Sequence, residues 1–313
     1  MKIIKECLLA IVVGSLTAAP LFAAQQDKAN GTRVYTVGTG TPVPESERAG
    51  ASVAVVYGDQ SFLFDVGSSV SNRLIKLAED GEKGLAPRNI QHLFITHMHS
   101  DHTLGFASVA LNLWWLREKQ LQVHGPVGTR SLVEHIIKAY GQDTEIRQST
   151  VVGGAGRVTD PTPTVSEITE PGVVYDDGEV KVEAFLVDHG DIEPAYGYKV
   201  TTPDKVTVIS GDTTYDERVA AQAKGADYLI HEVYSEAGLQ ASTDPKRPQR
   251  SDYHRHQHTS VEQVAKIAKQ AQPKLLVLSH ILKWSDSVEN MQAEMAKHYD
   301  GRFVFARDAM KLE

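Results

Sequence analysis

A dense group of metal-ligand side chains constrains this chain more than any other feature. The group consists of His97, His99, Asp101 and His102. An apolar run at 93–95 directly before it predicts a buried strand, and residues 103–116 after it predict an apolar helix. In α/β proteins the loop between such a strand and helix lies at the carboxyl edge of a sheet, where sites gather. Because the i, i+2 spacing places His97 and His99 on one side of extended chain, the group predicts a site for two adjacent metal ions.

The remaining ligands are expected at the ends of other apolar strands. His189, Asp212, His231 and His280 each directly follow a strand-like run. His189 suits a third ligand to the first metal, and Asp212, at a strand end beside Gly211, suits a bridge between the two metals. For His231, support of the ligands from behind and contact with substrate both remain open.

Three other features have two interpretations each. Asp65 follows a strand, and it either orients a ligand histidine or caps a helix predicted at 69–79. A tryptophan pair at 114–115 either lines an aryl pocket or lies in the core, as aromatic residues on an apolar helix do. A Lys-Trp pair at 283–284 either binds an anionic aryl group or packs at the surface.

The first residues have the features of an export signal. Lys2 and Lys5 form a positive region, and the apolar segment at 8–21 that follows is short for a membrane span and contains Pro20. We therefore expect a secretory signal peptide at 1–24. This predicts a secreted protein, in the periplasm, without a membrane anchor in its mature form.

The length suits one large globular domain or two small ones, and we expect a single catalytic domain at 31–313. Hydrophobic residues make up 41% of the chain, which is enough for a sizeable core. The one cysteine, Cys7, lies in the expected leader, so no thiolate is available as a zinc ligand in the mature protein. The formal net charge of −8 disfavours a nucleic-acid partner. We expect a small-molecule substrate and no nucleic acid.

The ligand pattern resembles that of the metallo-β-lactamase superfamily. The match spans about 34–313, in which the HxHxDH motif, His189, the Ser-Gly-Asp-Thr stretch around Asp212, and His280 stand in the family's order. The chain resembles most the branch that contains the tRNA 3′-endonuclease RNase Z and the type II arylsulfatases. The resemblance implies an α/β (α+β) fold, a four-layer αβ/βα sandwich with the site at one edge of its two sheets.

The resemblance also implies two zinc ions per chain, with manganese and iron left open by the nitrogen and oxygen ligands. The first metal would be held by His97, His99 and His189, and the second by Asp101, His102 and His280, with Asp212 between them. A water between the ions would become hydroxide near neutral pH, and Asp101 would accept its proton. His258, oriented by Glu232, would protonate the leaving oxygen. The alternative for His258 is a neighbour of the helix cap at 259–260.

The function expected from this resemblance is a secreted dinuclear zinc hydrolase that cleaves a small ester, either an aryl sulfate or a phosphodiester, by attack of metal-bound hydroxide. Two departures from the nuclease pattern favour this over RNA. Only five residues, 201–205, stand where a tRNA-clamping arm is expected, and Ile281–Trp284 replaces a Ser/Arg phosphate pocket. Hydrolysis of a β-lactam or lactone, and a non-catalytic metal-binding protein, remain alternatives. A homodimer is a further open expectation.

Overall fold

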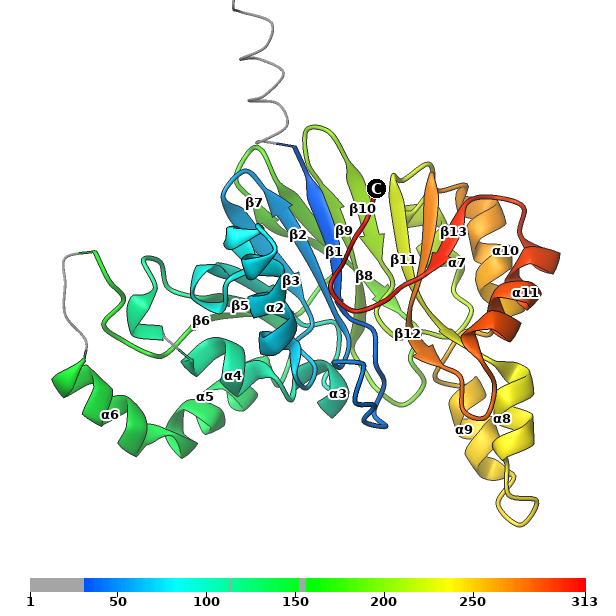
Figure 1. The fold of residues 1–313 in the computed structure, drawn as a ribbon, viewed down its shortest axis with the longest axis horizontal. Coiled ribbons are helices and arrows are strands. Elements are labelled where there is room, and N and C mark those ends of the chain that lie inside the picture. Colours follow the sequence, from blue (N-terminus) through cyan, green and yellow to red (C-terminus); the bar gives the residue numbers. More distant parts are fainter. Residues whose placement is uncertain (1–30, 113, 152–155) are drawn as a thin grey trace, which may run out of the picture.

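Two β-sheets face each other in the computed structural model, and helices cover their outer faces (Figure 1). The structure describes residues 31–112, 114–151 and 156–313. The signal peptide expected at 1–24 lies outside the described residues, so it and the export of the protein stay predictions. Among the helices of the described residues, none is both long and apolar enough to cross a membrane.

Among the described residues, each sheet contains seven strands. In both sheets, counted from one edge, three antiparallel pairings are followed by three parallel ones. The first sheet runs β14 (Met310–Lys311), β1 (Arg33–Gly38), β2 (Ser52–Tyr57), β3 (Gln60–Phe64), β4 (His92–Phe94), β5 (Gln122–Pro126) and β6 (Thr164–Ile168). The second runs β13 (Phe303–Phe305), β12 (Leu275–Leu282), β11 (Tyr228–Tyr234), β10 (Val206–Ile209), β9 (Ala195–Thr201), β8 (Lys181–Val187) and β7 (Gly172–Asp176).

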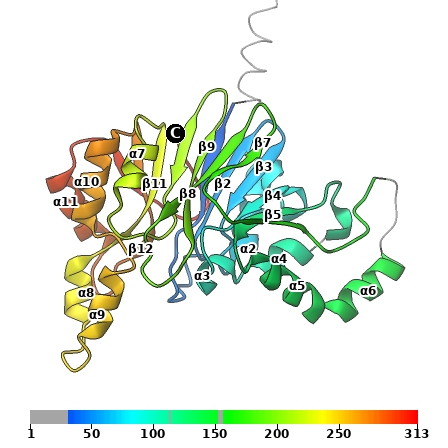
Figure 2. The ribbon, with the colours of Figure 1, turned by 180° about the vertical axis from the view of Figure 1, so that it is seen from behind.

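The helices lie mainly on the outer faces and at one end of the sandwich (Figures 1 and 2). They are α2 (Val70–Glu79), α3 (Ser100–Thr103), α4 (Phe106–Leu111), α5 (Thr129–Ala139), α6 (Gly141–Thr150), α7 (Glu217–Gln222), α8 (Glu236–Ser242), α9 (Gln249–Arg255), α10 (Val261–Ala271) and α11 (Val288–His298). Short 3-10 turns are found at Lys83–Leu85, Pro87–Asn89 and Trp114–Leu116. Both views show the α5–α6 and α8–α9 pairs extending away from the sheets.

The alternation of side chains along the strands produces the four layers. On β2, Val53 and Val55 join the core between the two sheets, whereas Ala54 and Val56 join the core under the helices of the first sheet. A third core lies between the second sheet and α7, α10 and α11. The predicted α/β four-layer sandwich is confirmed.

The helix predicted over 103–116 is wrong in its extent, because the chain is divided there into α3, α4 and a 3-10 turn. The division falls at Gly105, whose N–H donates to Val66 O at 2.8 Å. A Cβ at Gly105 would stand 2.2 Å from Gly67 O. This close backbone contact fixes the chain between the two short helices. Trp114 is buried in the core, as the second interpretation of the tryptophan pair required.

Parallel pairing brings the carboxyl ends of several strands to one edge. In the first sheet β3, β4, β5 and β6 are parallel, and in the second β10, β11, β12 and β13 are parallel. The loops that follow these strands therefore meet at the same end of the sandwich, where Figure 1 shows α3. This end collects the ligand-type residues.

Two buried histidines far from that edge predict a loss of stability in acid. Burial lowers the pKa of His92 and of His124 to about 4, while an unfolded histidine has a pKa of about 6.5. Below pH 6.5 the unfolded chain therefore binds protons that the folded chain does not, and the free energy of unfolding falls as the pH falls toward 4. For each histidine we expect a loss of about 2 kcal/mol between about pH 7.5 and pH 5.

Urea unfolding of the wild type and of His92→Gln at both pH values measures this loss. The variant is expected to lose about 2 kcal/mol less than the wild type on acidification. His135→Gln is the control, because that side chain is exposed on α5. Equal pH dependence in all three proteins would contradict the prediction.

Candidate metal centre

Seven ligand-type side chains from both sheets converge at the carboxyl edge. They are His97 and His99 after β4, Asp101 and His102 on α3, His189 after β8, Asp212 after β10 and His280 on β12. The ligand atoms of one group, His97, His99, His189 and Asp212, all lie within 4.8 Å of one another. Those of a second group, Asp101, His102 and His280, do so as well. The structure thus brings together every ligand predicted from the sequence.

A single carboxylate oxygen, Asp212 Oδ2, lies between the two groups. Its distances to imidazole nitrogens are 3.9 Å to His97 Nε2, 3.3 Å to His102 Nε2, 4.0 Å to His189 Nε2 and 3.5 Å to His280 Nε2. The other oxygen, Oδ1, is buried without a hydrogen-bond partner. This is the position that a bridging ligand requires.

Hydrogen bonds on the outer side of the rings direct unprotonated nitrogens inward. His189 Nδ1 donates to Gln257 O at 2.7 Å, so Nε2 carries the lone pair that faces the cluster. Thr96 Oγ1 donates to Asp65 and therefore accepts from His97 Nδ1 at 2.9 Å, which again leaves Nε2 inward. The sequence analysis did not predict that Thr96 and Gln257 orient these histidines. For Thr96, its position directly before His97 was a signal in the sequence.

Asp65 orients the cluster instead of capping α2. Its Oδ2 accepts from His102 Nδ1 at 2.8 Å and its Oδ1 accepts from Thr96 N at 2.8 Å. The residue before α2 is Ser69, and no side chain caps that helix. Asp65 has a φ of 58°, a left-handed conformation that is unusual for a residue with a Cβ. Of its two interpretations, support of a ligand histidine is therefore the correct one.

His280 reaches the cluster through a bulge. Opposite β11, Ser279 pairs with Glu232 and Ile281 with Val233, so His280 has no partner in the ladder. Its φ of 44° is left-handed as well. Bulges of this kind redirect a side chain next to a site. Here the ring turns toward Asp101, whose Oδ2 lies 3.0 Å from His280 Nε2.

The electrostatics of the cluster favour a bound cation. Burial lowers the pKa of His97 well below its usual value and that of His189 to about 4, so both rings are neutral. Burial alone would raise the pKa of Asp212, but the neighbouring charges of His280 and His102 hold it well below its usual value. The lone pairs that His97 and His189 direct inward, next to this buried ionised carboxylate, form a set of donors that suits a cation. His99 Nδ1 also lies 3.0 Å from His97 Nε2 and 3.1 Å from His189 Nε2, a convergence of nitrogens that suits a shared metal ion.

His258 and Glu232 lie beside this cluster. His258 Nδ1 is 3.4 Å from Glu232 Oε2 and 3.9 Å from Asp212 Oδ2. The ligand atoms of Asp212, His258 and His280 also form a group that could hold a metal. His258 precedes the capped start of α10 at Ser260, so both of its sequence interpretations agree with its location.

His231 is fully buried beside the cluster. Its Nδ1 bonds to Glu232 O at 2.7 Å, and Nε2 has no hydrogen-bond partner. Together with Asp212 and His280 it lines a cavity of about 30 Å³ between the sheets, large enough for a water molecule. Of the two roles left open by the sequence, support of the cluster is the one that its position permits.

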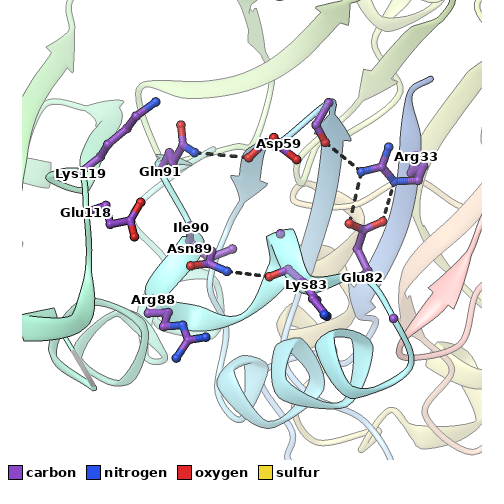
Figure 3. A pocket seen from close by; sticks show the side chains of 13 residues that line it. Arg33, Asp59, Glu82, Lys83, Arg88, Asn89, Ile90, Gln91, Glu118 and Lys119 are labelled. Carbon is purple, nitrogen blue, oxygen red and sulfur yellow. Dashed lines mark hydrogen bonds and ion pairs between the residues drawn. The ribbon is translucent and has the colours of Figure 1, made fainter. Parts of the chain in front are cut away.

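A larger cavity of about 540 Å³ lies at the opposite end of the first sheet, where β1 and β4 begin (Figure 3). Figure 3 shows that its charged groups partly neutralise one another, with Arg33 Nε donating to Glu82 at 2.6 Å. Asn89 and Gln91 on its wall donate to backbone carbonyl oxygens. We therefore place the chemistry at the metal cluster.

Comparison with solved structures supports the fold. A human tRNase Z, short form, superposes with a TM-score of 0.63 at 22% sequence identity, over 90% of this chain and 98% of that chain. A metallo-beta-lactamase fold protein from Bacillus subtilis has the same TM-score at 18% identity, over 90% of this chain and 98% of its own. At these identities the comparisons establish the architecture alone.

Comparison with characterised sequences finds proteins named ribonuclease Z. One from Mycobacterium sp. (strain KMS) is 32% identical over 253 residues, which cover 80% of this chain and 84% of the relative. Another, from Mycobacterium bovis (strain BCG / Pasteur 1173P2), is 29% identical over 283 residues, or 88% of this chain and 96% of the relative. The similarity thus extends along most of both chains.

Two expectations from the sequence are wrong in the light of these relatives, which are named ribonuclease Z: a small ester as the substrate, and the absence of a nucleic-acid partner. The physical reason is that a net charge of −8, summed over the whole chain, does not describe the potential at one site. Metal ions bound there would add local positive charge. The short connection at 201–205 concerns one accessory element and does not alter the chemistry of the cluster.

The packing of Gly67 predicts a way to disturb the cluster without removing a ligand. A Cβ at Gly67 would lie 2.4 Å from Asp101 O and 2.5 Å from Gly50 Cα, and neither backbone atom can move independently. We expect Gly67→Ala to displace the loop of Asp101, to lower the amount of bound metal and to destabilise the fold by about 1–3 kcal/mol.

Metal analysis after dialysis and urea unfolding measure these effects. Gly141→Ala is the matched control, because a Cβ at that position meets no atom within 4 Å. A metal content and a stability equal to those of the wild type in Gly67→Ala would show that the loop adapts.

The family model for the beta-lactamase superfamily domain matches residues 61–281. The matched segment contains all seven ligand-type residues and also Glu232 and His258. The family predicted from the ligand pattern is confirmed by this match, by the relatives and by the two-sheet fold. The chain belongs to the metallo-β-lactamase superfamily of hydrolases, in the part of it that contains ribonuclease Z.

Proposed function

We propose that this protein is a metal-dependent phosphodiesterase that cleaves RNA, as the name ribonuclease Z of its relatives suggests. The observation that carries the proposal is the pair of ligand groups that share Asp212 Oδ2, with His258 and Glu232 beside them. Two metal ions a short distance apart are a recurrent arrangement for phosphodiester hydrolysis.

The donor set fits two zinc ions. We assign His97, His99 and His189 to the first ion, Asp101, His102 and His280 to the second, and Asp212 to both. We choose zinc because imidazoles and carboxylates are common zinc ligands. Manganese and iron accept the same ligands. When bound, such a pair lowers the pKa of a water molecule and neutralises charge on phosphate oxygens.

His258 and Glu232 are suited to deliver a proton to the leaving oxygen. Glu232 Oε1 accepts from Thr259 N at 2.7 Å, which leaves Oε2 directed toward His258 Nδ1 at 3.4 Å. Burial, and then the charge of Asp212, raise the pKa of Glu232 well above its usual value, whereas burial lowers the pKa of His258 to about 4. Glu232 therefore holds a proton that His258 Nδ1 can accept while Nε2–H protonates the leaving oxygen.

The surface near this edge offers cations to an RNA backbone. Lys246, Arg247 and Arg250 are exposed in and after the connection between α8 and α9. Figure 1 shows that this helix pair extends from the second sheet at the end that carries α3. Phosphate groups need such local cations and not a positive net charge of the whole chain.

Cleavage of a 3′-extended tRNA transcript by the zinc-loaded protein tests the proposal. We expect a shortened product with the wild type and at least about a 100-fold lower rate with His97→Ala, because that variant loses a metal ligand. His135→Ala is the control histidine, exposed and bonded within its own helix. If the wild type with its metals restored cuts neither this transcript nor an unstructured RNA, the proposal is wrong.

The role of His258 as proton donor is tested by comparing substrates with poor and good leaving groups. His258→Ala is expected to slow RNA cleavage by about 10²- to 10⁴-fold, because a ribose oxygen needs a proton to leave. Cleavage of thymidine 5′-(p-nitrophenyl) phosphate should fall far less, because nitrophenolate leaves without one. Equal losses on both substrates would exclude His258 as the donor.

Zinc content distinguishes this role of His258 from metal binding. His258→Ala should keep the wild-type amount of zinc, and a lower amount would assign His258 to the ligands. Glu232→Gln, which retains an acceptor for Thr259 N, should lower the RNA rate without lowering the zinc content.

A further inference from the structure

A continuous series of aromatic rings leads from the metal cluster toward the surface. The ring centroid of His258 lies 5.6 Å from that of His280 on one side and 6.2 Å from that of His254 on the other, with both pairs stacked. His254 is followed by Trp284 at 5.0 Å in an edge-to-face contact and by Tyr253 at 5.3 Å. The series begins at a ligand and passes through the proposed proton donor.

The outer end of this series is accessible. Tyr253 has 48% of its surface exposed, and His254 and Trp284 are half-buried. Trp284 packs with one side against a small cluster that includes Tyr234, at 5.9 Å between ring centroids, and Leu239. His254 Nδ1 is enclosed without a hydrogen-bond partner. The three rings thus offer a flat apolar surface at the outer end of the series.

The backbone of Trp284 is held in an unfavourable conformation. Its φ of 46° lies in the left-handed region, which a bulky side chain rarely adopts. Strain of this kind persists where the surroundings hold a residue in place, and it is concentrated at functional sites. Asp65 and His280, which belong to the metal cluster, are also left-handed.

We propose that Trp284, His254 and Tyr253 form a subsite that stacks a nucleobase next to the scissile phosphate. This inference rests on the proposed function and names the part of the RNA that the site recognises beyond the phosphate. A nucleotide whose oxygen is protonated by His258 carries its base one ribose away, on the side where the ring series continues. Stacking on aromatic side chains is a general way to hold single-stranded RNA, and it tolerates every base.

The neighbouring charge agrees with a nucleotide. Lys283 directly precedes Trp284, and its Nζ lies 3.5 Å from Glu45 Oε2 with 31% of the side chain exposed. Arg48 Nε is 3.9 Å from the same carboxylate oxygen. Two cations that share one acidic partner leave positive charge at the rim of the subsite. A phosphate on the far side of the stacked nucleotide would meet this charge.

The test compares adenosine 5′-monophosphate with ribose 5-phosphate, which lacks the base, by tryptophan fluorescence and calorimetry on the zinc-loaded protein. We expect the nucleotide to quench the emission saturably and ribose 5-phosphate to leave it unchanged. The chain has three tryptophans. The quench should disappear in Trp284→Phe and persist in Trp115→Phe, the matched control, whose side chain lies under Arg147.

Affinity gives the second measurement. Trp284→Ala should bind the nucleotide roughly ten-fold more weakly and ribose 5-phosphate as the wild type does. Trp284→Phe, which keeps a ring, should lose less affinity and guards against misfolding of the alanine variant. Equal affinities of the wild type for the two probes, or an unchanged nucleotide affinity in Trp284→Ala, would overturn the subsite.

RNA cleavage separates the subsite from the proposed reaction. If the wild type cleaves no RNA but shows the base-dependent quench at Trp284, the reaction is wrong and the subsite remains. If it cleaves RNA while Trp284→Ala keeps the wild-type KM and nucleotide affinity, the reaction remains and the subsite is wrong. With both correct, the alanine variant should raise KM for RNA more than it lowers kcat.

Discussion

The buried carboxylate of Asp212 is the constraint on which the rest of the site depends. Its Oδ2 lies within 4.0 Å of imidazole nitrogens from His97, His102, His189 and His280, and only 2% of the residue is exposed. Outer hydrogen bonds to Gln257 O and to Thr96 fix the rings so that lone pairs face inward. Such an arrangement of negative charge and lone pairs is favourable only around cations. The two sheets serve to hold it.

His258 connects the metal cluster with the aromatic rings that lead to the surface. Its ring stacks on His280 on one side and on His254 on the other. Its Nδ1 lies 3.4 Å from Glu232 Oε2. The proposed proton donor and the proposed base-stacking rings would therefore lie on the same side of the metal cluster. In the proposed reaction, a substrate on the aromatic surface would place its leaving oxygen near His258, and this orientation would itself contribute to the rate.

Local patterns predicted most of the elements that position the site. The apolar run at 93–95 largely coincides with β4 (His92–Phe94), the helix predicted at 69–79 largely coincides with α2 (Val70–Glu79), and α10 begins after the capping residue Ser260. Helix α6 was not anticipated, because its sequence is polar on nearly every face and lacks the apolar period. The predicted helix at 103–116 is interrupted at Gly105, because the backbone there packs closely against Gly67, which is distant in sequence.

The sequence by itself determined the donor atoms, the strand ends that carry them and the family, because ligand chemistry and apolar periodicity are local properties. Only the tertiary structure decided that Asp65 supports His102, that His231 is buried behind the cluster and that Trp284 continues the rings of His258. These relations join segments tens to hundreds of residues apart. They arise when parallel strands of two sheets bring their carboxyl ends to one edge, and no local pattern encodes such distances.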